Sequence, residues 1–301
     1  MMRKKPMLAH PVGGFERIKD DDWPLYSQPK LDGVRCLIQF EKGFNPSIDP
    51  SYDDRDKVVA YSRTGKEWKN IDHILAQLKP FFQKHPDVIL DGELYNHDLK
   101  NDFEKIISLV RKTKPTISDR IESAGMVQFH CYDIINEDWH FEDRNLFRQQ
   151  NFSYYGDYRC DSVISVDHGI VHNTEEVEVA HEEYLERGYE GSILRKNEVY
   201  ECKRSWTLMK VKDFSDAEAI IVGYEEGKGK REGRLGKFIM QDEDGNQFGC
   251  PPGKGYNYQD MKDMLKDIHK YMGQTATFTY FERTKKGSYR HPLFKAIRNY
   301  E

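Results

Sequence analysis

The pattern of elements that follows Lys212 constrains the fold most strongly. Residues 217–224 read as a strand, and a stretch rich in glycine and charge leads to a second strand at 237–241. A third strand starts at Gln247, and one amphipathic helix precedes a last strand at 275–282. Strands around a single helix within about 90 residues are typical of a small Greek-key barrel of the OB type. The helix is expected to present one apolar face, formed by Met261, Leu265, Ile268 and Met272.

The segment before this pattern mixes helices with strands. Apolar residues fall on one face of each of two predicted helices: Ile71, Ile74, Leu75, Leu78 and Phe82 in the first, and Phe103, Ile106, Ile107 and Val110 in the second. A third helix is predicted from Asn173 to Gly188, with Glu176 completing a capping box. Strand-like runs lie at 33–40, 58–62, 88–94, 126–135, 162–167 and 192–194. We therefore predict an α+β domain with a mainly antiparallel sheet over residues 1–213, followed by the OB-type domain over 214–301.

The composition excludes several classes of protein. Only 38% of the residues are hydrophobic, but 18 Tyr, 16 Phe and 4 Trp supply enough apolar surface for a core, so we do not expect a disordered chain. The net charge of −5 excludes a generally basic nucleic-acid coat protein. Neither a membrane-length apolar run nor a signal peptide occurs, and five cysteines without a CxxC pair fit neither a zinc ribbon nor a disulfide framework. We expect a cytoplasmic protein that does not enter membranes.

The most informative motif is Lys30–Arg35 (KLDGVR), just before a predicted strand. It places an amine, a carboxylate and a guanidinium at one turn, beside a glycine that lets the backbone approach a ligand. A lysine nucleophile must lose its proton, and nearby positive charge or burial lowers its pKa. Taken alone, the motif also fits a surface turn.

Five further motifs follow in order. Each combines charge with a predicted strand or turn: Tyr61–Lys66 (YSRTGK), Leu90–Leu94 (LDGEL), Phe129–Asp133 (FHCYD), Glu190–Arg195 (EGSILR) and Leu208–Lys212 (LMKVK). In the last motif, period-two alternation places both lysines on one face of a strand. With these motifs in this order, the chain resembles the covalent nucleotidyltransferases, and most closely the minimal ATP-dependent DNA ligases. The resemblance continues in the second domain through 233–237, 247–249, 280–284 and 290–294.

The resemblance implies an adenylation domain before the OB-type domain and a role for each matching residue. Lys30 would attack the α-phosphorus of ATP and become a lysyl-AMP phosphoramidate. Asp32 belongs to the same catalytic motif, and Lys210 and Lys212 would contact the nucleotide phosphates. The remaining implied roles are adenine recognition by Gln28, adenine stacking by Phe129, ribose and nick-phosphate contacts by Arg35 and Arg63, ribose and metal contacts by Glu93, metal binding by Glu190, and a place for Arg204 in a basic segment.

General chemistry supports these roles but leaves alternatives. Nucleotidyl transfer adds a nucleophile to an anionic phosphorus, so charge neutralisation and alignment supply most of the catalysis. Glu93 and Glu190 offer the oxygen ligands that Mg²⁺ or Mn²⁺ prefers. Either acid can instead be an ordinary ion-pair partner, Phe129 can be a core residue, and Arg204 can be solvated surface. Asp133 is expected to order the local structure.

Contacts with nicked duplex DNA must come from local charge, because the chain is acidic overall. Two basic patches are present: Lys228, Lys230, Arg231, Arg234 and Lys237 in one, and Arg283, Lys285, Lys286, Arg290, Lys295 and Arg298 in the other. Such patches suit sequence-independent phosphate contacts with a strong dependence on salt. Only Arg298 is available for the charged C-terminal residues that orient pyrophosphate in related ligases. We expect a monomer of phage, viral or accessory bacterial type that encircles the duplex incompletely.

Three other functions compete with DNA ligation. An RNA ligase or an mRNA capping guanylyltransferase shares the lysine motif and the acid-glycine strands, and a capping enzyme would form lysyl-GMP. The segment from Arg290 to Arg298 favours the DNA ligases. A non-catalytic nick-binding module is the third alternative, although such a module would not need the three lysines and two acids together.

Overall fold

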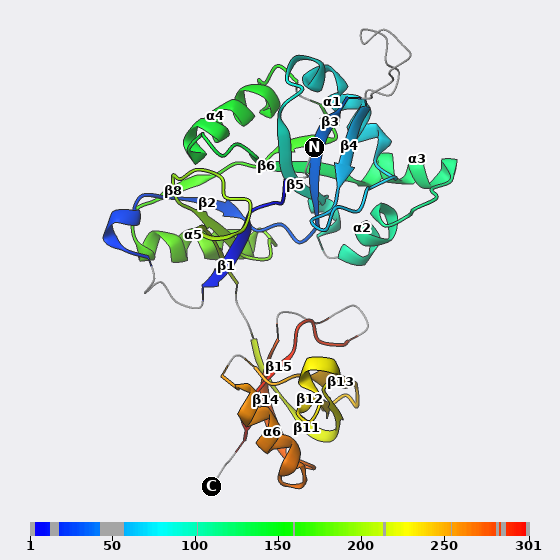
Figure 1. Cartoon of the computed structure of the whole chain (residues 1–301), viewed down its shortest axis with the longest axis vertical. Coiled ribbons are helices and arrows are strands. Elements are labelled where there is room, and N and C mark those ends of the chain that lie inside the picture. The colour runs from blue at the N-terminus through cyan, green and yellow to red at the C-terminus, as the bar shows by residue number, and fades with distance from the viewer. Residues whose placement is uncertain are drawn as a thin grey trace. The chain divides into compact units, whose positions relative to one another are not determined.

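The computed structural model describes residues 4–12, 18–42, 57–100, 102–158, 160–212, 215–253, 255–280, 283 and 287–298. The chain divides into two compact units, Met1–Lys212 and Asp213–Glu301, which we call the N-terminal unit and the C-terminal unit (Figure 1). Within the described ranges, no helix has both the length and the apolar character needed to cross a bilayer.

Two five-stranded sheets form the N-terminal unit. The first has the order β1 (Leu8–Val12), β10 (Arg204–Val211), β9 (Ser192–Arg195), β2 (Leu25–Pro29) and β8 (Gly169–Val171). The second has the order β4 (Lys57–Tyr61), β3 (Val34–Glu41), β5 (Ile89–Tyr95), β6 (Gln128–Ile134) and β7 (Val163–Ser165). The pairs β1–β10 and β6–β7 are parallel, and the other strand pairs described in this unit are antiparallel. The prediction of a mainly antiparallel α+β domain is therefore confirmed.

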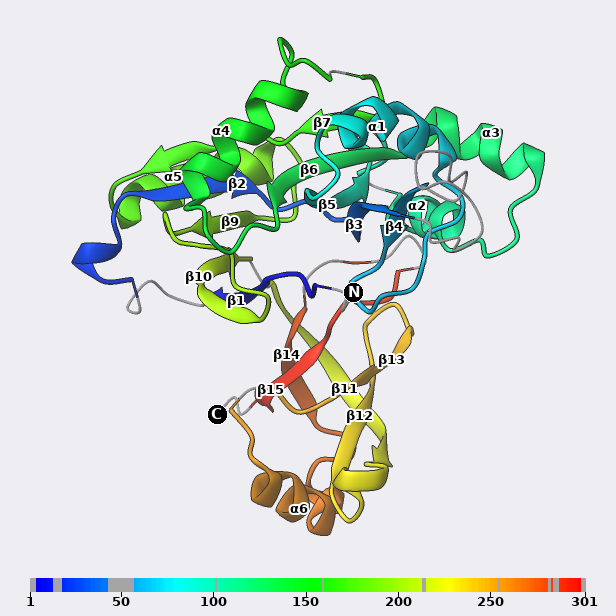
Figure 2. The ribbon, with the colours of Figure 1, turned by 45° about the horizontal axis from the view of Figure 1, so that its top comes forward.

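The described part of this unit contains five α-helices, which flank the sheets or pack on one another (Figure 2). The second sheet contacts α1 (Asp72–Lys84), α2 (Phe103–Val110) and α4 (Phe141–Phe152), while α3 (Ile117–Met126) packs on α1 and α2. The first sheet is covered by α5 (Thr174–Glu186). Two short 3-10 turns are η1 (Asp20–Asp22) and η3 (His97–Leu99). The main core lies between the second sheet and its helices and includes the fully buried rings of Phe81, Phe82 and Phe129.

Two of these helices lack the apolar period that revealed the others. The inward face of α4 carries buried polar residues, among them Arg144, Asn145 and Arg148. In α3, Ile117 and Ile121 are exposed, 79% and 69% respectively, and no apolar stripe marks the buried side. Helix periodicity identifies apolar faces, so it could not identify either helix.

The start of α5 departs from the predicted capping box. The Asn173 side chain accepts from the Glu176 N–H at 2.9 Å, as expected. The Glu176 carboxylate, however, accepts from the backbone N–H of His172 at 2.8 Å instead of that of Asn173. The helix still begins and ends where predicted, because Gly188 takes a φ of +84° just beyond its C-terminus.

Among its described residues, the C-terminal unit has one five-stranded sheet and one α-helix. The order is β13 (Gln247–Cys250), β12 (Leu235–Gln241), β11 (Ser215–Glu226), β14 (Thr275–Tyr280) and β15 (Leu293–Ile297). The edges meet just after β13, where Pro252 bridges Phe294 in parallel, the Phe294 N–H donates to the Pro251 carbonyl at 2.9 Å, and the Gly253 N–H donates to the Phe294 carbonyl at 3.0 Å. A five-strand Greek-key sheet whose edges touch in this way is the partly open barrel of the OB type, so this prediction is also confirmed.

The helix of this unit is shorter than predicted. The structure has α6 (Tyr258–Lys266), followed by the 3-10 turn η5 (Ile268–Lys270), and a further turn, η4 (Gly229–Arg231), lies between β11 and β12. The buried residues of α6 are Met261 and Met264. The prediction of one helical face that continues through Met272 was therefore wrong, because α6 ends at Lys266, before it reaches that residue.

Candidate active site

A cavity of about 240 Å³ opens in the N-terminal unit, and strands of both sheets supply its walls. Most of its polar lining residues come from the sequence motifs. The lining comprises Leu8, Ala9, Gln28, Pro29, Lys30, Leu31, Arg35, Arg63, Glu93, Tyr132, Ile193, Arg195, Arg204, Leu208 and Lys210. Five residues expected to bind the nucleotide and two expected to contact DNA, Arg63 and Arg204, thus surround one space, and basic side chains outnumber acidic ones around it.

Lys30 sits where β2 ends, opposite the turn that carries Glu190. The Lys30 N–H donates to the Gly191 carbonyl at 2.8 Å, and the Glu190 N–H donates to the Lys30 carbonyl at 3.0 Å. Gly191 has a φ of +145°, and a Cβ there would lie 2.3 Å from the Val211 carbonyl oxygen. Only glycine fits this position, which explains why glycine follows the acid in this motif.

The carboxylate of Glu190 holds two lysines together. One oxygen forms an ion pair with Lys30 Nζ and the other with Lys212 Nζ, while the Glu190 side chain is only 4% exposed. Both oxygens are therefore engaged by ammonium groups. The structure shows Glu190 in the ion-pair role that the sequence left open, and the metal role expected of this residue stays a prediction.

Glu93 is the carboxylate that lines the cavity itself. Burial, together with the negative charge of Asp91, raises its pKa from 4.5 to about 7, although the positive charges of Arg35 and Lys30 oppose this rise. The Tyr132 hydroxyl donates to Glu93 at 3.3 Å. Glu93 can therefore exchange a proton near neutral pH.

The aromatic ring at the cavity is Tyr132, and the expectation that Phe129 stacks on a nucleobase is wrong. Phe129 is fully buried in the main core. Successive side chains alternate across a strand, so Phe129 and Cys131 pack into the core while Tyr132 lines the cavity. The guanidinium groups of Arg35 and Arg195 lie 5.2 and 5.6 Å from the centre of the Tyr132 ring. This alternation was the sequence signal that could have selected Tyr132.

Arg35 reaches the cavity from β3 while a buried acid fixes its guanidinium. Its Nε and Nη2 donate to the two carboxylate oxygens of Asp91 at 2.6 and 2.5 Å. The Tyr200 hydroxyl donates to the same carboxylate at 2.7 Å. Burial raises the pKa of Asp91 in spite of this pairing. Two planar hydrogen bonds hold Arg35 in one orientation, with its remaining edge toward the cavity.

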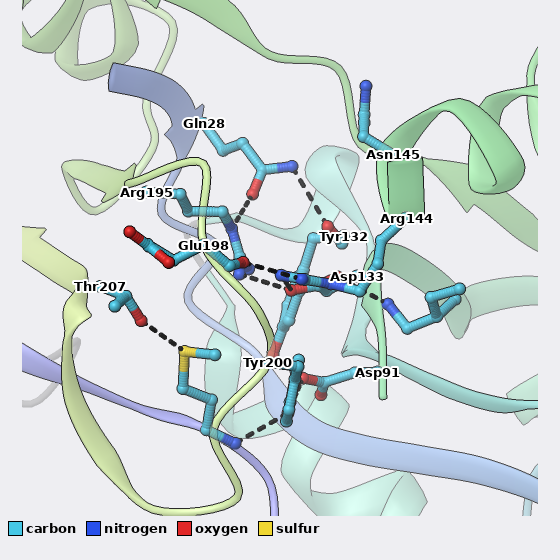
Figure 3. A network of polar contacts seen from close by, with 12 residues as sticks. Gln28, Asp91, Tyr132, Asp133, Arg144, Asn145, Arg195, Glu198, Tyr200 and Thr207 are labelled. Carbon is cyan, nitrogen blue, oxygen red and sulfur yellow. Dashed lines mark hydrogen bonds and ion pairs between the residues drawn. The ribbon is translucent and has the colours of Figure 1, made fainter. Parts of the chain in front are cut away.

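A second buried acid, Asp133, is the cross-strand partner of Asp91 and organises further residues of the site (Figure 3). Asp133 accepts from Arg144 Nε at 2.8 Å and from Arg195 Nη1 at 2.7 Å, and these two arginines lower its pKa against the effect of burial. Arg195 Nε in turn donates to the Gln28 side-chain oxygen at 2.7 Å. Gln28 is 1% exposed. Asp133 thus orders the site without lining it, as expected, and Arg195 is a lining residue to which no role was assigned from the sequence.

The remaining expected residues of this unit divide into two groups. Arg63, Arg204 and Lys210 line the cavity, and Arg204 also donates to the Ala9 carbonyl. Asp32 does not line it, and its charge acts instead on Tyr95, whose pKa it helps to raise. Lys212 also lies outside the lining and reaches the site through its ion pair with Glu190.

The residues of the C-terminal unit that were expected to contact DNA differ in their exposure and in their partners within the protein. Lys228, Lys230 and Arg231 are exposed on and beside η4. Arg283 is held by Asp244 at 3.1 Å and by the Tyr289 hydroxyl at 2.5 Å, so much of its guanidinium is engaged within the protein. The further expected residues are Arg290, which is half-buried, and Lys285 and Lys286, which lie outside the described residues. Arg298 forms an ion pair with Glu218 of β11.

The described residues contain no cluster of three His, Cys, Asp or Glu side chains that could hold a metal by themselves. Mg²⁺ commonly binds through one or two carboxylates together with substrate phosphates. Glu93 therefore suits such a cation only when a phosphate ligand shares it.

Comparison with known proteins shows the family to which the chain belongs. The model of the ATP dependent DNA ligase domain matches residues 6–212, and that of the DNA ligase OB-like domain matches residues 226–298. The DNA ligase of Enterobacteria phage T4 is 26% identical over 265 residues, which cover 75% of this chain and 52% of the phage protein. The DNA ligase of African swine fever virus is 30% identical, over 76% of this chain and 55% of the viral protein. The chain spans about half the length of these curated relatives.

Solved structures share the fold at lower identity. A Lig E DNA ligase matches with a TM-score of 0.73 and 23% identity, covering 99% of this chain and 100% of its own. The bacteriophage T7 ATP-dependent DNA ligase, solved with ATP, matches with a TM-score of 0.52 and 17% identity over 98% of each chain. Since the first family model alone covers more than half of the residues, the chain belongs to the ATP-dependent DNA ligases.

Proposed function

We propose that this protein seals nicks between a 5′-phosphate and a 3′-hydroxyl in duplex DNA, through lysyl-AMP on Lys30 and an adenylated 5′ end. One observation carries the proposal. Lys30 lines a cavity at which basic side chains outnumber acidic ones, and its ammonium contacts Glu190, which also binds Lys212. A nucleophile amid clustered positive charge is the arrangement that attack on a triphosphate requires.

In the first step, Lys30 Nζ bonds to the α-phosphorus of ATP, and the bond from that phosphorus to pyrophosphate breaks. The attacking amine must first lose a proton, and Glu190 is the carboxylate in contact with it. Lys210, Arg63 and Arg204 surround the same space and can neutralise the phosphate charge. We further propose that the Tyr132 ring stacks on the base and that the Gln28 amide contacts its edge.

A divalent cation, Mg²⁺ or Mn²⁺, would supply additional neutralisation of the triphosphate. Glu93 is the lining carboxylate that fits it, provided that phosphate oxygens complete the coordination. Because the pKa of Glu93 is raised to about 7, binding of a cation there would release a proton near neutral pH.

DNA binding is proposed for both parts of the chain, as an adenylation domain over 1–213 and an OB domain over 214–301. The exposed basic residues Lys228, Lys230 and Arg231 suit contacts with phosphates of a nicked duplex. We propose that the protein acts as a monomer in the cytoplasm, or in the host cytoplasm if a phage encodes it.

The test uses the full chain with Mg²⁺, labelled ATP or GTP, and nicked duplexes of DNA or RNA. We expect covalent labelling of the chain by ATP but not by GTP, and sealing of nicked DNA. Both the labelling and the sealing should be lost in Lys30→Ala. A covalent label from GTP would favour a capping guanylyltransferase, and sealing of RNA but not of DNA would favour an RNA ligase. Nick binding without any covalent label would indicate a non-catalytic module and would refute the proposal.

A further inference from the structure

The short turn η3 follows the strand that carries Glu93, and it packs against the segment that carries Glu190. η3 follows β5 almost directly, so His97 lies close in sequence to Glu93. The His97 ring packs on the ring of Tyr189, with the ring centres 4.5 Å apart. Since Tyr189 immediately precedes Glu190, the His97 ring of η3 contacts the side chain of the residue next to Glu190.

Hydrogen bonds strengthen this connection. The Tyr95 hydroxyl lies 2.8 Å from His97 Nδ1, and Tyr95 is only 2% exposed. Burial lowers the pKa of His97, and Lys100 lowers it further, while a hydrogen bond to the backbone of Arg187 opposes both. A neutral imidazole accepts at one nitrogen and donates at the other. One ring can therefore accept from Tyr95 and donate to the carbonyl of Arg187.

Lys100 makes a second connection to the same place. Its Nζ donates to the Arg187 carbonyl at 2.9 Å. A Cβ at Gly188 would lie 2.7 Å from Lys100 Nζ, so the lysine side chain lies directly against the backbone of that glycine. His97 within η3 and Lys100 just after it thus both contact the backbone of Arg187, at the C-terminal end of α5. Tyr95, His97 and Lys100 form what we call the η3 clasp.

An apolar cluster and a backbone hydrogen bond connect the η3 clasp with the reacting groups. On one side, Tyr95 belongs to a small apolar cluster with Leu31 and Tyr189. On the other, the Glu190 N–H donates to the Lys30 carbonyl at 3.0 Å. Small errors in alignment are costly, because a misplacement of about 1 Å lowers an enzyme's rate by about 10²-fold.

We propose that His97 is a positioning residue for lysine adenylation, which fixes Tyr189 and so holds Glu190 at a set distance from the strand of Glu93. The inference rests on the proposed function of the cavity. His97 does not line that cavity, so it acts through Tyr189 and Glu190 and makes no contact with the nucleotide itself.

The test measures single-turnover labelling of the full chain by ATP as a function of ATP concentration. His97→Ala should lower the maximal rate about tenfold, while the ATP concentration for half-maximal rate changes less than about twofold. His97→Asn places an amide oxygen near the position of Nδ1 and should recover part of the rate. His85→Ala is the matched control, because the His85 ring also packs on an aromatic ring, that of Phe81 with the ring centres 5.0 Å apart, and its other ring partners, Phe147 and Tyr158, lie outside the clasp; we expect no change in rate.

Hydrogen exchange separates failure of the clasp from failure of the proposed function. The amide of Glu190 should exchange faster in His97→Ala than in the unmodified protein, whether or not the chain labels with ATP. An unchanged maximal rate with unchanged exchange would overturn the inference. So would an equal loss of rate in His85→Ala, or a His97→Asn variant no faster than His97→Ala. If the unmodified chain forms no lysyl-AMP but exchange at Glu190 still responds to His97→Ala, the proposed function fails and the clasp stands.

Discussion

Replacement of Glu93 by Gln should stabilise the protein, and the gain should grow with pH. Burial raises the pKa of this carboxyl from 4.5 to about 7 in the folded state. A group whose folded pKa lies above its unfolded value binds more protons when folded, so the wild-type protein loses stability as pH rises through that window. Glutamine has the shape of the neutral acid and carries no such cost.

The size of the effect follows from the shift. The pKa of Glu93 rises from 4.5 to about 7, and each pKa unit corresponds to about 1.4 kcal/mol. The ionised carboxylate therefore destabilises the folded state by about 3 kcal/mol at high pH. Glu93 lines a cavity and is half-buried, so solvent reduces this value. We expect the difference between Glu93→Gln and wild type to grow by about 2 kcal/mol between about pH 5 and about pH 8.5.

Urea unfolding followed by tryptophan fluorescence suits this measurement. All four tryptophans, Trp23, Trp68, Trp139 and Trp206, lie in the N-terminal unit, so the signal reports the unit that contains Glu93. Glu182→Gln, an exposed position on α5, is the matched control and should stay within about 0.5 kcal/mol of wild type at both pH values. A difference for Glu93→Gln that does not vary with pH, or that becomes more destabilising as pH rises, would refute the reasoning.

Three further predictions test separate parts of the structure. Tyr132→Leu should raise the ATP concentration for half-maximal labelling about tenfold at unchanged fold, whereas Phe129→Leu should lower stability by about 1 kcal/mol and leave that concentration unchanged; the reverse result would restore Phe129 to the cavity. Asp133→Asn leaves two buried arginines without a counter-charge, and urea unfolding should show a loss of about 3–5 kcal/mol, while a loss below 1 kcal/mol would contradict the ion-pair account. The triple change Lys228→Gln, Lys230→Gln and Arg231→Gln should reduce the slope of log affinity against log salt for nicked duplex by about 2 to 3, as measured by fluorescence anisotropy, and an unchanged slope would exclude this loop from phosphate contact.

The sequence predicted the elements whose residues follow a simple period. Helices α1 and α5 and most strands of the second sheet appeared where apolar spacing placed them. β2 was not predicted, because its residues Ser27 and Gln28 are polar although both are buried. The same is true of α4, whose inward face carries Arg144 and Arg148. Polar residues that are buried to satisfy one another follow no hydrophobic pattern, and only the three-dimensional structure identifies their partners.

The candidate site shows the same division. The order of motifs predicted that the residues around Lys30, Glu93 and Lys210 meet, and they line one cavity. The order of the motifs could not reveal that the two carboxylate oxygens of Glu190 form ion pairs with two lysines, since this depends on how β2, β9 and β10 lie side by side. It also could not assign Arg195, whose importance comes from contacts with Gln28 and Asp133 far away in sequence.

The most direct test of the account is to locate the covalent adenylate by peptide mapping after incubation of the full chain with ATP and Mg²⁺. The account predicts that the peptide containing Lys30 carries the AMP group through an acid-labile P–N bond, and that Lys210 and Lys212 remain unmodified. An adenylate on any other residue, or a chain that releases pyrophosphate without retaining AMP, would contradict the central claim.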